Sequence, residues 1–167
     1  MEITLDQLLA SREARTSHQR ELIGGYPGRT LICLTVIMPG KVKRNHQSII
    51  VAQAALSALV NRFSDGIVHL ETRDLPTGYE AYLLTPLSVE EAKRAVCIIE
   101  DTHPLGRLFD LDVIGEDGAP VSRQSVGAEL RRCLICGNEA RFCMRNRTHT
   151  QEELMARIDE MIADYVR

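Results

Sequence analysis

Two carboxylates stand two residues apart in an otherwise apolar segment of this 167-residue chain. They are Asp110 and Asp112, in the run LFDLDVI at positions 108–114. These residue types favour a β-strand, and side chains at i and i+2 of a strand point to the same face. Two like charges held that close repel each other unless a cation lies between them, and Mg²⁺ bound to carboxylates and substrate phosphates is a common solution. The pair therefore predicts a magnesium and phosphate site; the alternative is the solvent-facing side of an amphipathic hairpin.

A second group of chemically capable residues lies further along the chain, where a Cys-x-x-Cys motif is followed by Gly137. The candidate metal ligands are Cys133, Cys136, Cys143 and His149. Three thiolates and one imidazole can enclose a structural Zn²⁺ ion in a closed tetrahedral site, and the glycine permits the tight turn of a zinc knuckle. The last two ligands depart from the regular spacing of a knuckle, so the alternative is a group of reduced cysteines near a substrate pocket. Cys33 and Cys97 are expected in the hydrophobic core.

Arginine is concentrated around these cysteines. Between positions 123 and 149 six arginines accompany two glutamates, which gives a local charge of +4 in a chain whose net charge is −3. The arginines are Arg123, Arg131, Arg132, Arg141, Arg145 and Arg147. Arginine suits bidentate binding of phosphate or carboxylate groups. The segment is therefore interpreted either as a solvated loop or as a surface that meets phosphates or an acidic partner.

The elements that must position these residues follow from the apolar pattern. A polar helix is predicted over 4–22, with Thr4 and Gln7 as its capping box. Strands are expected at 30–37, 67–73, 79–85 and around the aspartate pair, with helices at 46–63 and 89–100 between them. This β-α-β-β-α-β order predicts an α+β, ferredoxin-like core. Its helices should cover one face of the sheet, with the other face open or covered by the N-terminal helix.

The C-terminal third is predicted to add three features to that core. A turn at Glu116-Asp117-Gly118 should lead into a hairpin strand at 119–123. An irregular Arg/Cys-rich loop is expected at 124–149. A final amphipathic helix is expected at 150–166, where Thr150 and Glu153 form a capping box. The expected organisation is a single domain over 1–167, with a core at 1–123, the Cys/Arg-rich segment at 124–149 and the C-terminal helix at 150–167.

Composition narrows the class of protein. With 44% hydrophobic and 26% charged residues the chain has an ordinary globular composition, and its charge excludes a strongly electrostatic nucleic-acid binder. No apolar run approaches the ~20 residues that cross a membrane, and the N-terminus lacks a signal-peptide pattern. Five cysteines, an odd number, argue for thiols or metal ligands instead of disulfides. A cytoplasmic location is expected.

Four blocks of residues resemble a known family when taken together. They are the runs at 9–15 (LASREAR), 35–43 (TVIMPGKVK), 103–113 (HPLGRLFDLDV) and 132–137 (RCLICG), the last continued by Cys143, Arg145 and His149. The chain resembles the apo-citrate lyase phosphoribosyl-dephospho-CoA transferases, also called citrate lyase holo-acyl-carrier-protein synthases, over nearly its whole length. The last two blocks are specific in combination.

The resemblance implies a reaction and its partners. The substrate would be 2′-(5″-triphosphoribosyl)-3′-dephospho-CoA, whose phosphoribosyl-dephospho-CoA group is joined to a serine of the acyl carrier (gamma) subunit of citrate lyase. A phosphodiester forms and diphosphate leaves, so the protein would be a nucleotidyltransferase-type enzyme that uses Mg²⁺. Neither nucleic acid nor a membrane is expected as a partner. The Gly-Ser that precedes the acidic pair of common nucleotidyltransferases is absent here, so the metal site rests on the Asp-x-Asp geometry.

Roles for individual residues follow from that reaction, which mainly requires the negative charge of the phosphates to be neutralised. Asp110 and Asp112 would hold Mg²⁺ against the phosphates, and Arg107, expected on the same strand, would bind a phosphate oxygen. His103 is the candidate general base, and its alternative role is a cap or turn residue before Pro104. The further basic candidates for the substrate and the acidic carrier are Lys43, Arg12, Arg15, Arg145 and Arg147. For Arg12 and Arg15 the alternative is an exposed position on the first helix.

Two other functions stay open from the sequence. In the first, the same chemistry would apply to the carrier of a different lyase or decarboxylase. A different class is a non-catalytic, zinc-binding assembly module that chaperones an acyl carrier subunit and needs neither Asp110 nor Asp112.

Overall fold

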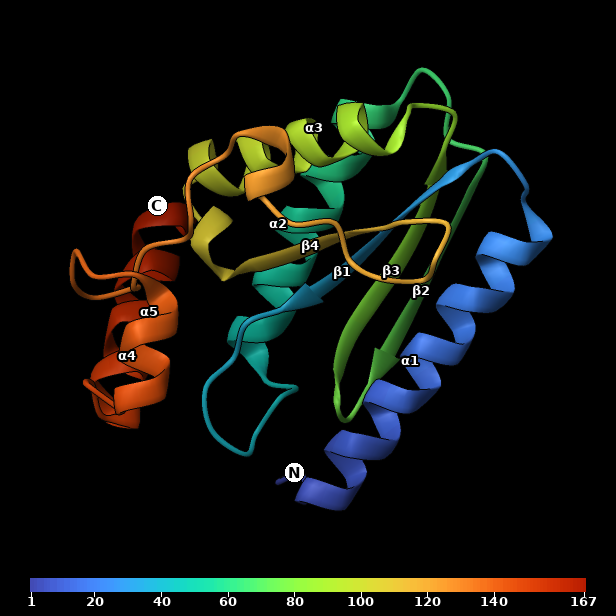
Figure 1. Cartoon of the computed structure of the whole chain (residues 1–167). Helices are drawn as coiled ribbons and strands as arrows, with labels where there is room; N and C mark the ends of the chain where they lie inside the picture. Colours follow the sequence, from blue (N-terminus) through green and yellow to red (C-terminus); the bar gives the residue numbers. More distant parts are fainter.

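A four-stranded antiparallel sheet with the strand order β2-β3-β1-β4 forms the centre of the protein (Figure 1). The computed structural model describes all residues from 1 to 167. The helices are α1 (Leu5–Gly25), α2 (His46–Phe63), α3 (Val89–Thr102), α4 (Ala140–Asn146) and α5 (Gln151–Val166). The strands are β1 (Thr30–Val36), β2 (His69–Leu75), β3 (Gly78–Thr85) and β4 (Phe109–Ile114). This order and pairing confirm the predicted α+β, ferredoxin-like core.

Local capping signals start the helices where the sequence predicts. Thr4 and Gln7 form a complete capping box at α1, and Ser88 with Glu91 forms one at α3. These reciprocal bonds satisfy backbone N–H groups that have no partner within the helix. The predicted and observed starts agree, whereas α1 runs three residues beyond its predicted end at 22.

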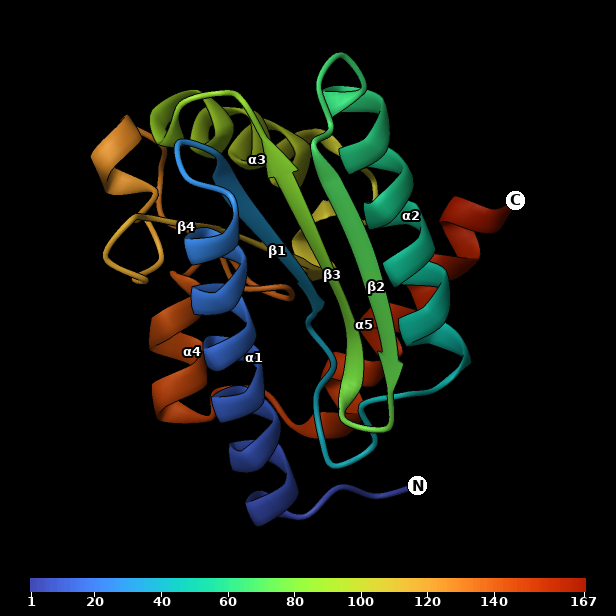
Figure 2. The ribbon, with the colours of Figure 1, turned by 90° about the vertical axis from the view of Figure 1, so that its right-hand side faces the viewer.

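The sheet separates two layers of helices (Figure 2). The larger core lies between the sheet and α2, α3 and α5, and includes Leu34, Leu83 and Phe109. A smaller apolar cluster on the opposite face joins Leu22 of α1 to the sheet. The N-terminal helix therefore covers the second face, as one of the two predicted arrangements requires.

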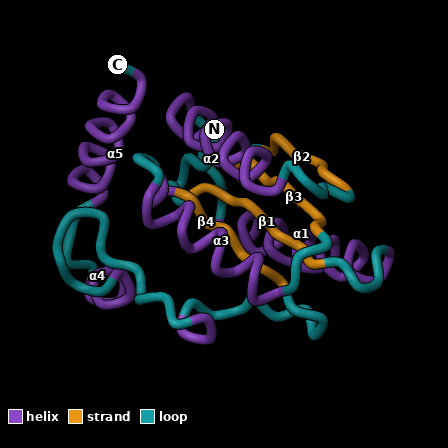
Figure 3. Tube along the Cα trace, turned by 90° about the horizontal axis from the view of Figure 1, so that it is seen from above, coloured by secondary structure: helices purple, strands orange, loops and turns teal.

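The two C-terminal helices lie beside the sheet at one end of the core (Figure 3). Ile158 and Ile162 of α5 are buried in the larger core, where α5 contacts α2. The short helix α4 precedes it and leaves most of its side chains exposed. None of the helices is both long and apolar enough to cross a membrane.

The predicted hairpin strand at 119–123 is wrong. The turn forms, and Gly115 donates to Ala119 and Val121 to Val113, but the only β-bridge joins Ile114 to Pro120. The ladder goes no further because the next edge N–H of β4, that of Leu111, donates to Glu100. Residues 124–149 are also less irregular than predicted, since they contain a 3₁₀ turn at Gln124–Val126 and the helix α4.

Candidate active site

The two aspartates lie on the edge strand β4, on the face that α1 partly covers. Asp112 pairs with Cys33 of β1, and Asp110 pairs with Thr35. The alternating residues Phe109 and Leu111 are fully buried on the opposite face, in the larger core. The predicted strand and the shared face of the carboxylates are therefore confirmed.

Burial and mutual repulsion make this pair electrostatically unfavourable. Burial raises the pKa of Asp112 to about 6, and the neighbouring charge of Asp110 is the second cause. Lys93 and Arg15 oppose this shift. The hydroxyl of Thr35 donates to Asp110 at 3.4 Å. A divalent cation held by both carboxylates would remove the repulsion, and hard oxygen ligands of this kind suit Mg²⁺.

Three adjoining cavities surround the pair. The first cavity, of about 360 Å³, is lined by both Asp110 and Asp112. The second, of about 310 Å³, is lined by Asp110 but not by Asp112. The third, of about 390 Å³, is mostly apolar. Ile37 and Met144 line all three, so the cavities meet at one place and can hold different parts of one extended ligand.

The structure brings three of the predicted basic residues to the second cavity. Arg12 and Arg15 reach it from α1, and Lys43 reaches it from the loop after β1. Arg15 also forms an ion pair with the buried Glu80 at 3.4 Å, whereas the ammonium of Lys43 donates to the carbonyl of Met38 at 2.7 Å. Burial lowers the pKa of Lys43, and the charge of Arg12 adds to this effect. Two of these cations thus have local partners already, while Arg12 has none.

Arg107 lies beside the pair but not on its strand. It belongs to the 3₁₀ turn Gly106–Leu108, which corrects the predicted position. Its Nε donates to the carbonyl of Arg132 at 2.6 Å, and the side chain lines both the first and the third cavity. Burial lowers the pKa of this guanidinium, and the nearby Arg131 adds to the effect. The remaining N–H groups of Arg107 can bind a phosphate oxygen in either cavity.

His103 does not meet the aspartates. It is the C-cap of α3, and its Nδ1 accepts the backbone N–H of Leu105 at 3.0 Å. The ring packs against Phe109 and Tyr165, on the helical side of the sheet. Burial lowers its pKa. The structure therefore places His103 as the turn residue of the alternative interpretation, away from the candidate site.

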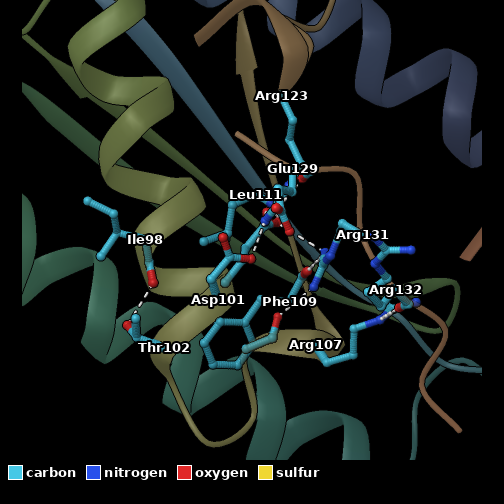
Figure 4. Close-up of polar contacts among 12 residues, drawn as sticks. Ile98, Asp101, Thr102, Arg107, Phe109, Leu111, Arg123, Glu129, Arg131 and Arg132 are labelled. Carbon is cyan, nitrogen blue, oxygen red and sulfur yellow. Dashed lines mark hydrogen bonds and ion pairs between the residues drawn. The ribbon is translucent and has the colours of Figure 1, made fainter. Parts of the chain in front are cut away.

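The arginine-rich segment divides into buried and exposed residues. Arg123 and Arg131 form ion pairs with the buried Glu100 of α3, at 2.9 and 3.2 Å. Glu100 also accepts the backbone N–H of Leu111 at 3.0 Å, and Arg131 donates to the carbonyl of Phe109 at 2.6 Å (Figure 4). This cluster attaches the segment to the free edge of β4. It removes two arginines from the surface predicted to meet phosphates or a partner.

The other predicted basic residues stay accessible. Arg145 lies in the last turn of α4, and Arg147 follows the helix in a left-handed conformation. Both are exposed, and neither lines one of the three cavities. They can meet a partner protein, whereas the geometry gives them no contact with a ligand inside the cavities.

The four candidate zinc ligands converge. The sulfur atoms of Cys133, Cys136 and Cys143 and a ring nitrogen of His149 all lie within 4.8 Å of one another. Cys136 is 3.4 Å from Cys143 and from Nε2 of His149. Two thiolates on one zinc ion lie roughly 3.8 Å apart, given Zn–S bonds of about 2.3 Å. The chain therefore presents a closed Cys₃His set that can hold a metal ion such as zinc.

Neighbouring groups prepare this cluster for a cation. Nδ1 of His149 lies 3.4 Å from the carboxylate of Glu153, which is the usual second contact of a zinc-bound histidine. Hydrogen bonds, first from the backbone at Asn138 and then from His149, lower the pKa of Cys136 to about 6. Of the predicted capping box at α5, only the bond from the Glu153 N–H to Thr150 is present. The carboxylate of Glu153 contacts His149 instead.

Sequence reasoning missed Lys93, which lines the first cavity with both aspartates. It is one of three lysines in the chain and lies on α3 among buried residues. Its helical spacing could have indicated a buried position. Cys97 and Glu100 follow Lys93 at i+4 and i+7, so all three residues share the face of α3 that packs on the sheet. A lysine on such a face is an exception to the apolar pattern.

The fold and the cavities define a class of protein: a ferredoxin-like α+β domain in which an acidic pair and several cations line adjoining cavities. The family model described as apo-citrate lyase phosphoribosyl-dephospho-CoA transferase matches residues 3–165. The chain belongs to this family.

Individual relatives agree with the family model. A Vibrio cholerae protein named "Probable apo-citrate lyase phosphoribosyl-dephospho-CoA transferase" is 40% identical over 169 residues, covering 99% of this chain and 94% of that protein. A Streptococcus pyogenes protein of the same name is 34% identical, covering 98% of this chain and 87% of its own length. Protein CitXG of Haemophilus influenzae is 35% identical over 98% of this chain, which corresponds to 36% of that protein.

Proposed function

We propose that this protein transfers the phosphoribosyl-dephospho-CoA group of 2′-(5″-triphosphoribosyl)-3′-dephospho-CoA to a serine of the citrate lyase acyl carrier subunit. The serine oxygen attacks the α-phosphorus of the triphosphate and forms a phosphodiester. The bond to the bridging α,β-oxygen breaks, diphosphate leaves with the electron pair, and the serine proton is released. Membership of the transferase family supports this reaction. The observation that carries it is the pair Asp110 and Asp112 in a cavity rich in cations.

Charge neutralisation is the main demand of such a step. Asp110 and Asp112 would hold Mg²⁺, which supplies Lewis acidity at the triphosphate when bound. Arg12, which has no partner, and Arg107, whose terminal N–H groups have none, line the adjoining cavities and are the proposed phosphate ligands. His103 is not proposed as the base, since it lies on the other side of the sheet.

Shape and charge also assign the long arm of the substrate. The mostly apolar third cavity, lined by Leu134 and Leu154, fits the pantetheine chain of dephospho-CoA. Lys43 and Arg107 line the same cavity and suit its diphosphate. None of the five cysteines forms a disulfide, which fits a reducing compartment such as the cytoplasm.

The intact mass of the carrier tests the proposal. Apo carrier subunit is mixed with the protein, the triphosphoribosyl nucleotide and Mg²⁺. We expect a mass gain equal to the nucleotide less diphosphate, lost when Mg²⁺ is omitted. A citrate lyase carrier that stays unmodified beside a modified carrier of another lyase or decarboxylase would reassign the partner. No modification of any carrier would favour the assembly-module function.

We also propose that the Cys₃His cluster binds one structural zinc ion. Metal analysis of the purified protein should find about one zinc per chain, and Cys136→Ser should lose it, since a closed tetrahedral site depends on every ligand. The variant should also unfold at a lower temperature, because zinc binding contributes to folding. Cys97→Ser is the matched control, as this cysteine lies in α3 outside the cluster, and its zinc content should equal that of the wild type. Zinc-free wild-type protein with full stability would contradict the proposal.

Arg145, in the last turn of α4, and Arg147, directly after this helix, should bind the carrier, since acyl carrier domains are usually acidic. We expect Arg145→Glu/Arg147→Glu to raise KM for the carrier about tenfold and to leave KM for the nucleotide unchanged. The effect should weaken at high salt, because exposed charges are screened. Arg62→Glu, on α2, is the control for a change of net charge. Equal losses for both substrates would rule out this division of labour.

A further inference from the structure

Lys93 is a largely buried lysine with no ion-paired anion. The residue as a whole is 5% exposed, and its ammonium, which is not itself sealed from the space around it, makes no hydrogen bond or ion pair with any other residue. Its neighbours on α3, Ala92 and Val96, are completely buried. Lysine is almost never buried unless it is paired, because loss of hydration of the charge is costly. The position therefore needs an explanation beyond packing.

Lys93 opens onto the first cavity. Lys93 lines this space together with Asp110, Asp112 and Arg107. The ammonium is close enough to Asp112 to lower the pKa of that carboxyl, yet the two groups form no ion pair. A cation in this position faces the same volume as the proposed magnesium ligands.

The other buried cations of the cavity are already neutralised. Arg123 and Arg131 both pair with Glu100, and Arg131 also donates to backbone carbonyls. Lys93 forms no such ion pair, and the half-buried Arg107 donates only to a backbone carbonyl. Both cations are therefore available to an anionic ligand in this cavity, beyond the electrostatic attraction between Lys93 and Asp112.

We propose that Lys93 is a catalytic residue that binds the phosphate oxygens of the substrate's triphosphate and of the diphosphate that leaves. This inference rests on the transferase function proposed above. The ammonium donates hydrogen bonds and keeps its protons throughout. As the bond between the α-phosphorus and the bridging oxygen breaks, negative charge accumulates on the leaving diphosphate, where a fixed cation stabilises it most.

Lys93→Met tests this role because it keeps the length of the side chain and removes the charge. We expect turnover to fall by roughly 10²-fold, as for loss of one preorganised electrostatic contact. The melting temperature should stay equal or rise, because an unpaired buried charge is lost. A structural role predicts the opposite, a lower melting temperature. Lys41→Met is the matched control, an exposed lysine outside the three cavities, and should behave as wild type.

Binding of inorganic diphosphate tests Lys93 without the carrier. Calorimetry with Mg²⁺ should show diphosphate binding roughly tenfold more weakly to Lys93→Met than to the wild type. If the wild type binds diphosphate but leaves every carrier unmodified, the transferase function fails while the role of Lys93 as a phosphate ligand stands. Turnover and diphosphate affinity within twofold of wild type in Lys93→Met would overturn the proposal.

A measurement on the wild-type protein covers the case in which Lys93→Met does not fold. With ¹³C-labelled lysine the chain gives three side-chain signals, because it has three lysines. Lys41→Met and Lys43→Met assign two of them, which leaves the third for Lys93. Diphosphate and Mg²⁺ should shift the Lys93 signal and leave Lys41 in place. An unchanged Lys93 signal at saturating diphosphate would also overturn the proposal.

Discussion

The double variant Asp110→Asn/Asp112→Asn is expected to modify the carrier at least about 10³-fold more slowly than the wild type. A metal ion at the phosphates contributes several kcal/mol of transition-state stabilisation, and each tenfold in rate corresponds to about 1.36 kcal/mol. Asparagine keeps the shape of each side chain but removes the charge that would hold the cation. The rate is measured by intact mass of the carrier under single-turnover conditions, with Mg²⁺ varied.

Stability separates a lost metal site from a damaged fold. The two carboxylates share one face of β4 and repel, so their neutralisation should leave the melting temperature of the metal-free protein unchanged or higher. Asp164→Asn, near the end of α5, is the matched control and should keep full activity. A double variant that is folded and retains more than about a tenth of wild-type turnover would falsify the assignment of these residues.

Glu100→Ala is expected to cause the largest loss of stability, about 3–5 kcal/mol in the free energy of unfolding. The side chain of Glu100 is 4% exposed and pairs with Arg123 and Arg131, which are themselves largely buried. Its removal leaves Arg131 without an anionic partner and Arg123 with only the exposed Asp101, at 2.9 Å. It also takes the acceptor from the Leu111 N–H on the free edge of β4. Urea unfolding followed by circular dichroism measures the change.

Two further variants locate the cause. Glu100→Gln keeps an acceptor for the Leu111 N–H and loses only the charge, so its destabilisation should be intermediate. Glu90→Ala, on the exposed side of the same helix, should change stability by no more than about 0.5 kcal/mol. If Glu100→Ala unfolds at the same urea concentration as Glu90→Ala, the ion-pair cluster does not hold the 123–131 segment to the core.

Local signals in the sequence were enough to predict most of the helices and strands. The capping pairs of α1 and α3, and the alternation that turns Asp110 and Asp112 away from Phe109, depend on residues within four positions of each other. The convergence of Cys133 and Cys136 also follows from short spacing. Interactions between residues this close in the sequence depend on the local residue types alone, so they can be predicted without knowledge of the tertiary structure.

The local pattern failed where a distant residue competes. Residues 119–123 have the sequence pattern of a strand that would pair with the free edge of β4. The N–H of Leu111 on that edge donates instead to Glu100 of α3, so the pairing does not extend. Glu153 satisfies the pattern of a capping box, yet its carboxylate contacts His149. In both places a carboxylate, of Glu100 or of Glu153, binds a partner that the local sequence pattern does not predict.

The sequence by itself determined the order of elements, the face on which the aspartates stand and the group of cysteine and histidine ligands. Only the tertiary structure decided which cations belong to the site. It paired Arg123 and Arg131 with Glu100, moved His103 to the helical side, and left Lys93 unpaired beside Asp112. The physical reason is that the energy of a buried charge depends on which counterions the folded chain brings within a few ångströms, and those counterions come from distant parts of the sequence.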